Sequence, residues 1–140
     1  MVDRPLILRK LDSLSLYATQ LTEFRGVDLE EYMRDWRVQR IVERTLQMAV
    51  ERCADIAEHL ISDEGGLRAP VSVADAFTVI KDAGIVSEAL HGALVKMAKF
   101  RNVVVHQYDE VDAEIVIGIL RKHLGIFDAF RAEILSHLQG

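Results

Sequence analysis

The chain has few of the residues that build a protein from disulfides, metal clusters or flexible linkers. Its 140 residues include a single cysteine, Cys53, which excludes an internal disulfide and a cysteine-rich zinc site. We expect Cys53 to be a small buried apolar residue rather than a nucleophile. Two prolines and eight glycines leave little room for disordered linkers. We therefore expect one domain over residues 1–140, large enough to bury its own core.

Long apolar runs are also missing. No stretch approaches the roughly 18 apolar residues that cross a bilayer. The opening MVDRPLILRKLDSL becomes charged too early for a secretory signal. Half of the residues are hydrophobic and 28% are charged, as in ordinary soluble globular proteins. These absences predict a cytoplasmic protein with no membrane partner.

An excess of positive charge is absent too. The formal net charge is −5, which argues against nucleic-acid binding driven by overall charge. One segment differs, because no acidic residue occurs between Glu88 and Asp109, whereas Lys96, Lys99 and Arg101 all fall there. Positive charge is therefore concentrated in one part of an acidic chain.

Hydrophobic periodicity indicates helices throughout. Apolar residues recur at alternating steps of four and three, and no segment shows a convincing period of two. The pattern predicts an all-α fold, an antiparallel bundle of about four to five helices. Tyr32 and Trp36 should anchor the core or an interface. The expected helices cover residues 7–21, 28–62, 73–81, 87 through about 106, and 112 almost to the end, with Ile115 facing inward in the last.

The stretch FRNVVVHQYDE raises a conflict, since three consecutive valines usually favour a strand. No glycine or proline precedes them, so we expect the preceding helix to continue through the valines. At about 100° per residue, Asn102 and His106 lie about 100° and 140° from Arg101. Tyr108 falls at about 340°, nearly on the bearing of Arg101. The valines should hold the helix to the core while these polar groups face a cleft or a partner.

These residue types suggest a chemistry. Arginine offers a fixed fork of donors for phosphate, and histidine can act as a general acid or base. Asparagine can bind substrate or orient the imidazole. Arg101 and His106 together fit cleavage of a phosphodiester by its neighbouring 2′-hydroxyl, which requires RNA. Taken alone, however, an arginine and a histidine on a helix are more often a surface pair.

No metal site is predicted. The histidines are scattered, and no His-Glu-x-x-His or comparable ligand spacing occurs. Arg52, Asp55 and His59 share a helical face, and we expect solvated ion pairs there rather than a shell behind a catalytic site.

The segment from Arg101 to His106 resembles the motif of the HEPN superfamily, an arginine and a polar residue followed at a short distance by histidine. With Tyr108 added, the Arg-x4-His-x-Tyr form resembles the HepT-like toxins. The segments ERTLQMAVERCADIAEHLI, VSVADAFTVIKDAGIV and DEVDAEIVIGILRKHLGIFDAFRAEIL are also similar to that family.

The resemblance implies a metal-independent ribonuclease that acts as the toxin of a toxin–antitoxin module and needs no cofactor. It implies a homodimer in which two motifs form a composite cleft for RNA. Arg101 and His106 would be catalytic and Asn102 would support them. Lys96 and Lys99 would contribute weakly to RNA binding.

The resemblance also implies a partner, a minimal nucleotidyltransferase that serves as antitoxin. In this family it can neutralise the toxin by adding AMP to the motif tyrosine, here Tyr108. The shared bearing of Tyr108 and Arg101 would place the added phosphate beside the guanidinium.

Two other classes of function stay open. A non-catalytic helical adaptor for a nucleotidyltransferase would keep the same fold. A helical substrate-binding half of a nucleotidyltransferase acting on small molecules is the other; the chain lacks the Gly-Ser and Asp-x-Asp residues of a transferase of its own.

Overall fold

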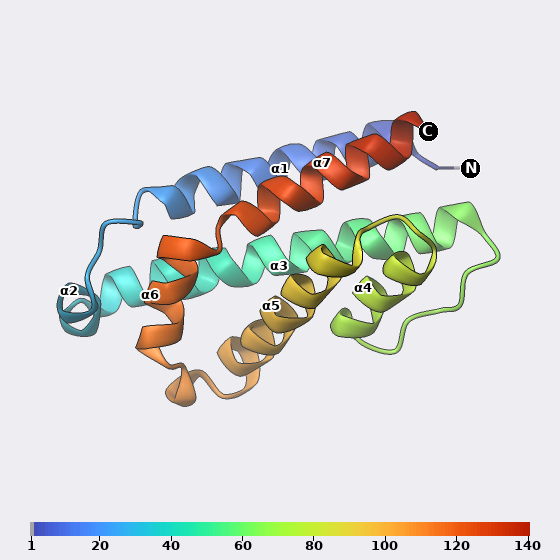
Figure 1. The fold of residues 1–140 in the computed structure, drawn as a ribbon. Helices are drawn as coiled ribbons and strands as arrows, with labels where there is room; N and C mark the ends of the chain where they lie inside the picture. The colour runs from blue at the N-terminus through green and yellow to red at the C-terminus, as the bar shows by residue number, and fades with distance from the viewer. Residues whose placement is uncertain (1) are drawn as a thin grey trace.

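The computed structural model describes residues 2–140 and contains only helices there, without any strand (Figure 1). The predicted all-α class is confirmed. The helices are α1 (Arg4–Thr22), α2 (Leu29–Arg34), α3 (Trp36–Glu64), α4 (Val73–Asp82), α5 (Glu88–His106), the 3₁₀ turn η1 (Tyr108–Glu110), α6 (Ala113–Lys122) and α7 (Gly125–Gln139).

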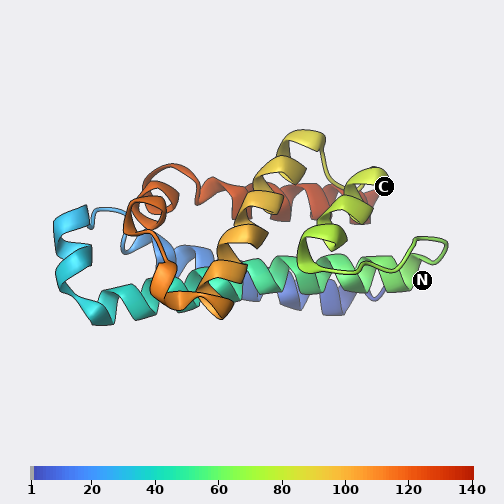
Figure 2. The ribbon, with the colours of Figure 1, turned by 90° about the horizontal axis from the view of Figure 1, so that it is seen from below.

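Helix α3 is the central element. It packs along α1 on one side, and α4 and α5 cover another side of it. Helix α7 returns beside α1, so that both chain ends lie at the same end of the molecule (Figures 1 and 2). The short helices α2 and α6 contact each other at the opposite end.

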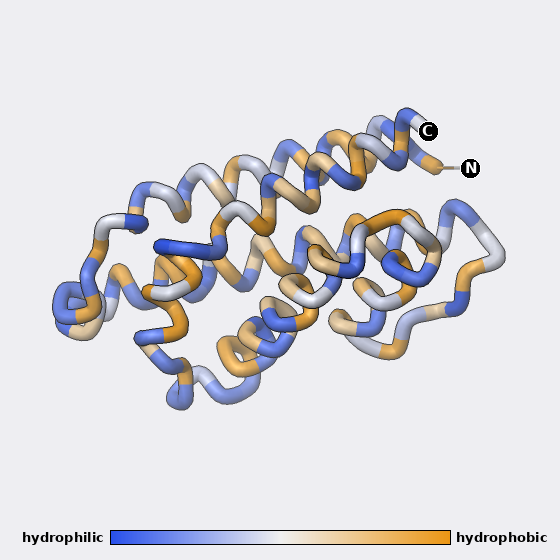
Figure 3. Tube along the Cα trace, in the orientation of Figure 1, coloured by the Kyte–Doolittle hydropathy of each residue, from blue (hydrophilic) through white to orange (hydrophobic). Residues whose placement is uncertain are grey.

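The core consists of one apolar stripe from each long helix. The stripe predicted between Ile7 and Leu21 is buried along its whole length. Cys53 is fully buried, as predicted. Hydrophobic and hydrophilic positions alternate along every helix in Figure 3. In residues 2–140, accordingly, no helix has the length and apolar content to cross a bilayer.

The expected continuous helix over residues 28–62 is wrong, because the chain breaks at Asp35. This residue has an extended backbone, and its carboxylate accepts from the backbone N–H groups of Arg37 (3.0 Å) and Val38 (3.3 Å). An aspartate that bonds nearby N–H groups offers the backbone an alternative to continuing a helix. The break turns Tyr32 into the core, at 2% exposure, and leaves Trp36 62% exposed. Tyr32 is the predicted core anchor; Trp36 lies outside the core.

The expected last helix is also divided, at His123 and Leu124, into α6 and α7. Seven α-helices therefore occur in residues 2–140, rather than the predicted four to five. The break lets α7 align with α1 while α6 turns toward α2 (Figure 1). Ile115, expected to face inward, is 53% exposed.

Helix α5 continues through the valines, as predicted. Ser87 caps its start by accepting from the N–H of Leu90 (3.2 Å). Phe100 and Val104 are buried, so packing overrides the strand preference of the valine run. The helix ends at His106, immediately before the acidic segment that begins at Asp109.

Candidate active site

Arg101 is fixed against α3 by a carboxylate that the sequence did not single out. Its Nε and Nη2 both donate to Oε2 of Glu51, at 2.8 and 2.6 Å. Both side chains are partly buried, and the amide of Gln47 also donates to Glu51 (3.3 Å). A charge-assisted contact of this kind defines the plane of the guanidinium. Glu51 therefore sets the direction in which Arg101 presents its remaining N–H groups.

Asn102 completes the support of the arginine. Its Oδ1 accepts from Nη1 of Arg101 at 3.1 Å, while the residue itself is exposed. Asn102 thus contacts the guanidinium, not the imidazole of His106. The supporting role expected for Asn102 stays a prediction.

His106 is the last residue of α5, and it is exposed. In residues 2–140 no hydrogen bond or ion pair connects it to another side chain. The five-residue separation turns it about 140° from Arg101 around the helix. Within one chain, the two groups flank the end of α5 from different sides rather than touching.

Tyr108 lies beyond the helix, and its expected alignment with Arg101 is wrong. Gln107 leaves helical geometry (φ −140°, ψ 45°), and Tyr108 begins the turn η1. Its side chain is 62% exposed. It lines a hollow of about 250 Å³ that it shares with Arg40 and Glu43 of α3. The phenol is therefore accessible, and it faces the first half of α3.

A buried polar pair forms the floor of this hollow. The hydroxyl of Tyr32 donates to Oε2 of Glu43 (3.3 Å), and Nη1 of Arg40 approaches Oε1 of the same carboxyl (3.4 Å). Burial raises the pKa of Glu43, although Arg40 and the bond from Tyr32 act to lower it. Burial, together with the charge of Glu43, also raises the pKa of Tyr32. Burial therefore makes the charged form of Glu43 less favourable than it is for an exposed glutamate.

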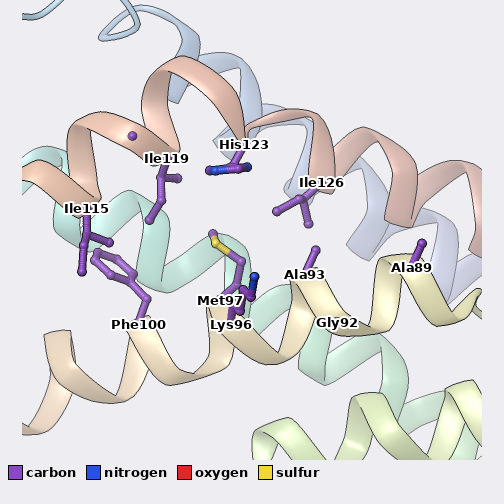
Figure 4. Close-up of a pocket in the computed structure, with 11 residues that line it drawn as sticks. Ala89, Gly92, Ala93, Lys96, Met97, Phe100, Ile115, Ile119, His123 and Ile126 are labelled. Carbon is purple, nitrogen blue, oxygen red and sulfur yellow. The ribbon is translucent and has the colours of Figure 1, made fainter.

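Lys96 and Lys99 are exposed on α5. From Arg101 they lie at about 220° and 160°, on the side of His106. Lys96 also borders a groove of about 590 Å³ between α5 and the α6–α7 corner (Figure 4). The remaining lining is almost entirely apolar or small, and the residues are Ala89, Gly92, Ala93, Met97, Phe100, Ile115, Gly118, Ile119, His123 and Ile126.

Other polar residues behave as ordinary surface groups. Asp55 accepts from Lys10 (2.5 Å), lies 3.3 Å from Arg52 and is 3.5 Å from His59, so the predicted helix-face ion pairs are confirmed.

Complete burial raises the pKa of the Cys53 thiol, which keeps it neutral. Within residues 2–140, no group of three or more His, Cys, Asp or Glu side chains is arranged to hold a metal ion.

Comparison with known proteins identifies the class. The model of the family "Ribonuclease HepT-like" matches residues 14–134. The chain belongs to this ribonuclease family, as the Arg-x4-His-x-Tyr resemblance predicted.

Individual relatives cover nearly the whole chain. The mRNA nuclease HepT of Shewanella oneidensis is 30% identical over 125 residues, which are 89% of this chain and 92% of that protein. The tRNA nuclease HepT of Aphanizomenon flos-aquae is 24% identical over 137 residues, 98% of this chain and 92% of that protein. A solved structure contains a tri-AMPylated S. oneidensis HEPN toxin in complex with an MNT antitoxin. That toxin is 29% identical to this chain with a TM-score of 0.86, and the match covers 97% of this chain and 99% of the toxin chain.

The buried carboxyl of Glu43 generates a prediction about stability and pH. Because its folded pKa is raised, its contribution to stability is present below its unfolded pKa, about 4.3, and is lost as pH rises through the folded value. Glu43→Gln does not titrate and keeps an acceptor for Tyr32. Wild type should therefore lose free energy of unfolding, relative to Glu43→Gln, as pH rises above about 4.

Urea unfolding at a series of pH values measures this difference. Glu58→Gln, at an exposed position of the same helix, is the matched control. Its free energy of unfolding should change with pH as that of wild type does. A wild type that gains stability over Glu43→Gln as pH rises would show that the carboxyl is favoured in its charged form.

Proposed function

We propose that this chain is a metal-independent endoribonuclease that acts as the toxin of a toxin–antitoxin module. The observation that carries the proposal is the anchored Arg101, held by Glu51 and Asn102, beside an accessible His106 at the same end of α5. A free imidazole can act as the general base and a fixed guanidinium can stabilise the charge of the phosphorane, so the two together suit transesterification of RNA. Membership in a ribonuclease family supports the same reaction.

In the proposed reaction, His106 removes the proton of a ribose 2′-hydroxyl. The 2′-oxygen attacks the adjacent phosphorus, and the bond from phosphorus to the 5′-oxygen of the next nucleotide breaks. The departing 5′-oxygen takes a proton from solvent, which yields a 2′,3′-cyclic phosphate and a 5′-hydroxyl. Arg101 stabilises the negative charge that builds on the phosphorane oxygens. Asn102 and Glu51 act by holding Arg101 in place.

The two catalytic groups diverge by about 140° on one helix, so we propose that a second copy completes the cleft. The apolar groove beside α5 supports a homodimer, because it borders the helix that carries the motif. Two copies would also bring two Arg101 side chains into one locally positive cleft, to which Lys96 and Lys99 contribute weakly.

Ala93→Arg tests the dimer, because Ala93 lines the groove and a long cation there would obstruct a second copy. We expect sedimentation velocity to show association at least about tenfold weaker, or about 1.4 kcal/mol, with loss of RNA cleavage. Leu16→Arg, at a 55% exposed position on α1, is the control. A wild type that is monomeric while it cleaves RNA would contradict the composite cleft.

Substitution of the motif tests the chemistry. His106→Ala should lower the rate of RNA cleavage by about 100-fold or more, and Arg101→Ala by a comparable factor. Thermal unfolding of each variant checks that it is folded. His59→Ala and Arg121→Ala remove the same residue types elsewhere and should cleave at nearly the wild-type rate.

The same comparison of wild type with the motif variants tests whether the chain is a non-catalytic adaptor. Cleavage that survives in both motif variants would contradict the assigned roles. If wild type free of bound AMP cuts no RNA yet binds the nucleotidyltransferase, the chain is a non-catalytic adaptor.

We propose that a minimal nucleotidyltransferase is the antitoxin and that it modifies Tyr108. The exposed phenol can attack the α-phosphorus of ATP, releasing pyrophosphate and the phenolic proton. The AMPylated state of the S. oneidensis HEPN toxin in its MNT complex supports this assignment.

Tyr108→Phe tests the modification. With ATP and a minimal nucleotidyltransferase antitoxin, wild type should gain the mass of one or more AMP groups and lose nuclease activity, whereas Tyr108→Phe should gain no mass and stay active. Tyr17→Phe, on α1, should behave as wild type. A Tyr108→Phe protein that is modified and neutralised normally would place the target elsewhere.

A further inference from the structure

A row of arginines on α3 leads toward the candidate active site. Arg37, Arg40 and Arg44 recur at helical spacing and are all exposed. With Trp36 and Gln47 they fall within an arc of about 100° around α3. Between Trp36 and Gln47 this arc contains no acidic residue, although the whole chain carries a net charge of −5.

The row meets the motif at two points. One turn beyond Gln47, on the same arc, Glu51 holds the guanidinium of Arg101. Near the start of the row, Arg40 shares a hollow with Tyr108. From Arg37 to Glu51 the row extends about 21 Å along α3. It is therefore a continuous surface that ends at the candidate active site.

The arginines of the row differ in how far a neighbouring carboxylate already balances their charge. Arg40 lies 3.4 Å from the carboxyl of Glu43 and shares its hollow with Asp109, so part of its charge is balanced. Within residues 2–140, Arg37 and Arg44 form no ion pair. Arg37 instead lies over the ring of Trp36, 5.2 Å from its centroid. Two cations thus remain free to bind an anion.

Trp36 gives the row an aromatic end. It is 62% exposed, so its indole ring is accessible to a planar partner that could stack on it. Alternating guanidinium groups and an exposed ring suit a single strand of nucleic acid, because arginines bind the phosphates and the ring stacks on a base. The row leads to Glu51, which holds Arg101, and this continuity favours the substrate strand over a protein partner as the occupant.

We propose that Trp36, Arg37, Arg40 and Arg44 form a track for single-stranded RNA that delivers the strand to Arg101 and His106. This proposal rests on the proposed ribonuclease function. It adds the surface that binds the part of the RNA lying at a distance from the scissile bond. It binds the sugar–phosphate backbone and one stacked base, so it contributes affinity with little sequence preference.

The test measures binding separately from cleavage. A labelled single-stranded 2′-O-methyl RNA cannot be cut, because it lacks the attacking hydroxyl, and its affinity is measured by fluorescence anisotropy across a salt series. The variant is Arg37→Gln/Arg44→Gln, which leaves the pair between Arg40 and Glu43 intact. Arg4→Gln/Arg9→Gln removes two exposed arginines from α1 and is the matched control.

We expect the track variant to lower the slope of log affinity against log salt by about 1.4, since each phosphate contact contributes about 0.7 for a single strand. Between about 50 and 200 mM salt, wild type should therefore lose about sevenfold more affinity than the variant. Trp36→Ala should weaken binding by about fivefold or more, and Trp36→Tyr should restore most of it. The α1 control should match wild type.

The possible failures are distinguishable. A wild type that neither binds nor cleaves RNA overturns the ribonuclease function itself. A wild type that cleaves RNA, with equal affinity and salt slope in the track variant, overturns the track alone. If the track variant loses affinity for the nucleotidyltransferase but not for RNA, the row is a protein-docking surface and the proposal is wrong.

Discussion

The contact between Arg101 and Glu51 is the interaction on which the candidate site depends. It joins α5, which carries the motif, to α3, which packs against most of the other helices. Nε and Nη2 of Arg101 both donate to Oε2 of Glu51. A small change in the angle at which α3 and α5 cross would therefore redirect the guanidinium. Helix α5 packs directly on α3, and its residues Phe100 and Val104 are buried. The same helix pair therefore contributes to the core and orients Arg101.

The arrangement separates three tasks along α3. Its buried stripe forms the core, Glu51 orients the arginine, and the exposed face before Glu51 carries the proposed RNA track. Tyr108 faces this last region, through the hollow it shares with Arg40. AMP added to Tyr108 would therefore lie across the approach to the site, so modification at one exposed residue could block the substrate without altering the fold.

Periodicity predicted the helices well because burial on one face leaves a strong signal in sequence. The stripe from Ile7 to Leu21 and the continuation of α5 through the valines both followed from it. The break at Asp35 did not, because a capping aspartate inside a polar stretch looks like any exposed helix residue. Of the two positions predicted for Trp36, the core or an interface, its exposure excludes the core, and the interface stays a prediction.

The motif residues could be located from the sequence, but their contacts could not. Glu51 is fifty residues from Arg101, and nothing local distinguishes it from other surface glutamates. The arginine row on α3 is invisible to net charge, which averages over the whole acidic surface. The angle around the helix axis predicted for Tyr108 is wrong, because the prediction assumed that α5 continues past His106.

The most direct test of the account is the chemistry of the cleaved ends. RNA incubated with purified, AMP-free protein in EDTA would be analysed by mass spectrometry of the products. The account predicts 2′,3′-cyclic phosphate and 5′-hydroxyl ends, and no cut where the 2′-oxygen is methylated. Products with 5′-phosphate and 3′-hydroxyl ends, or cleavage that requires a divalent metal, would contradict the roles given to Arg101 and His106.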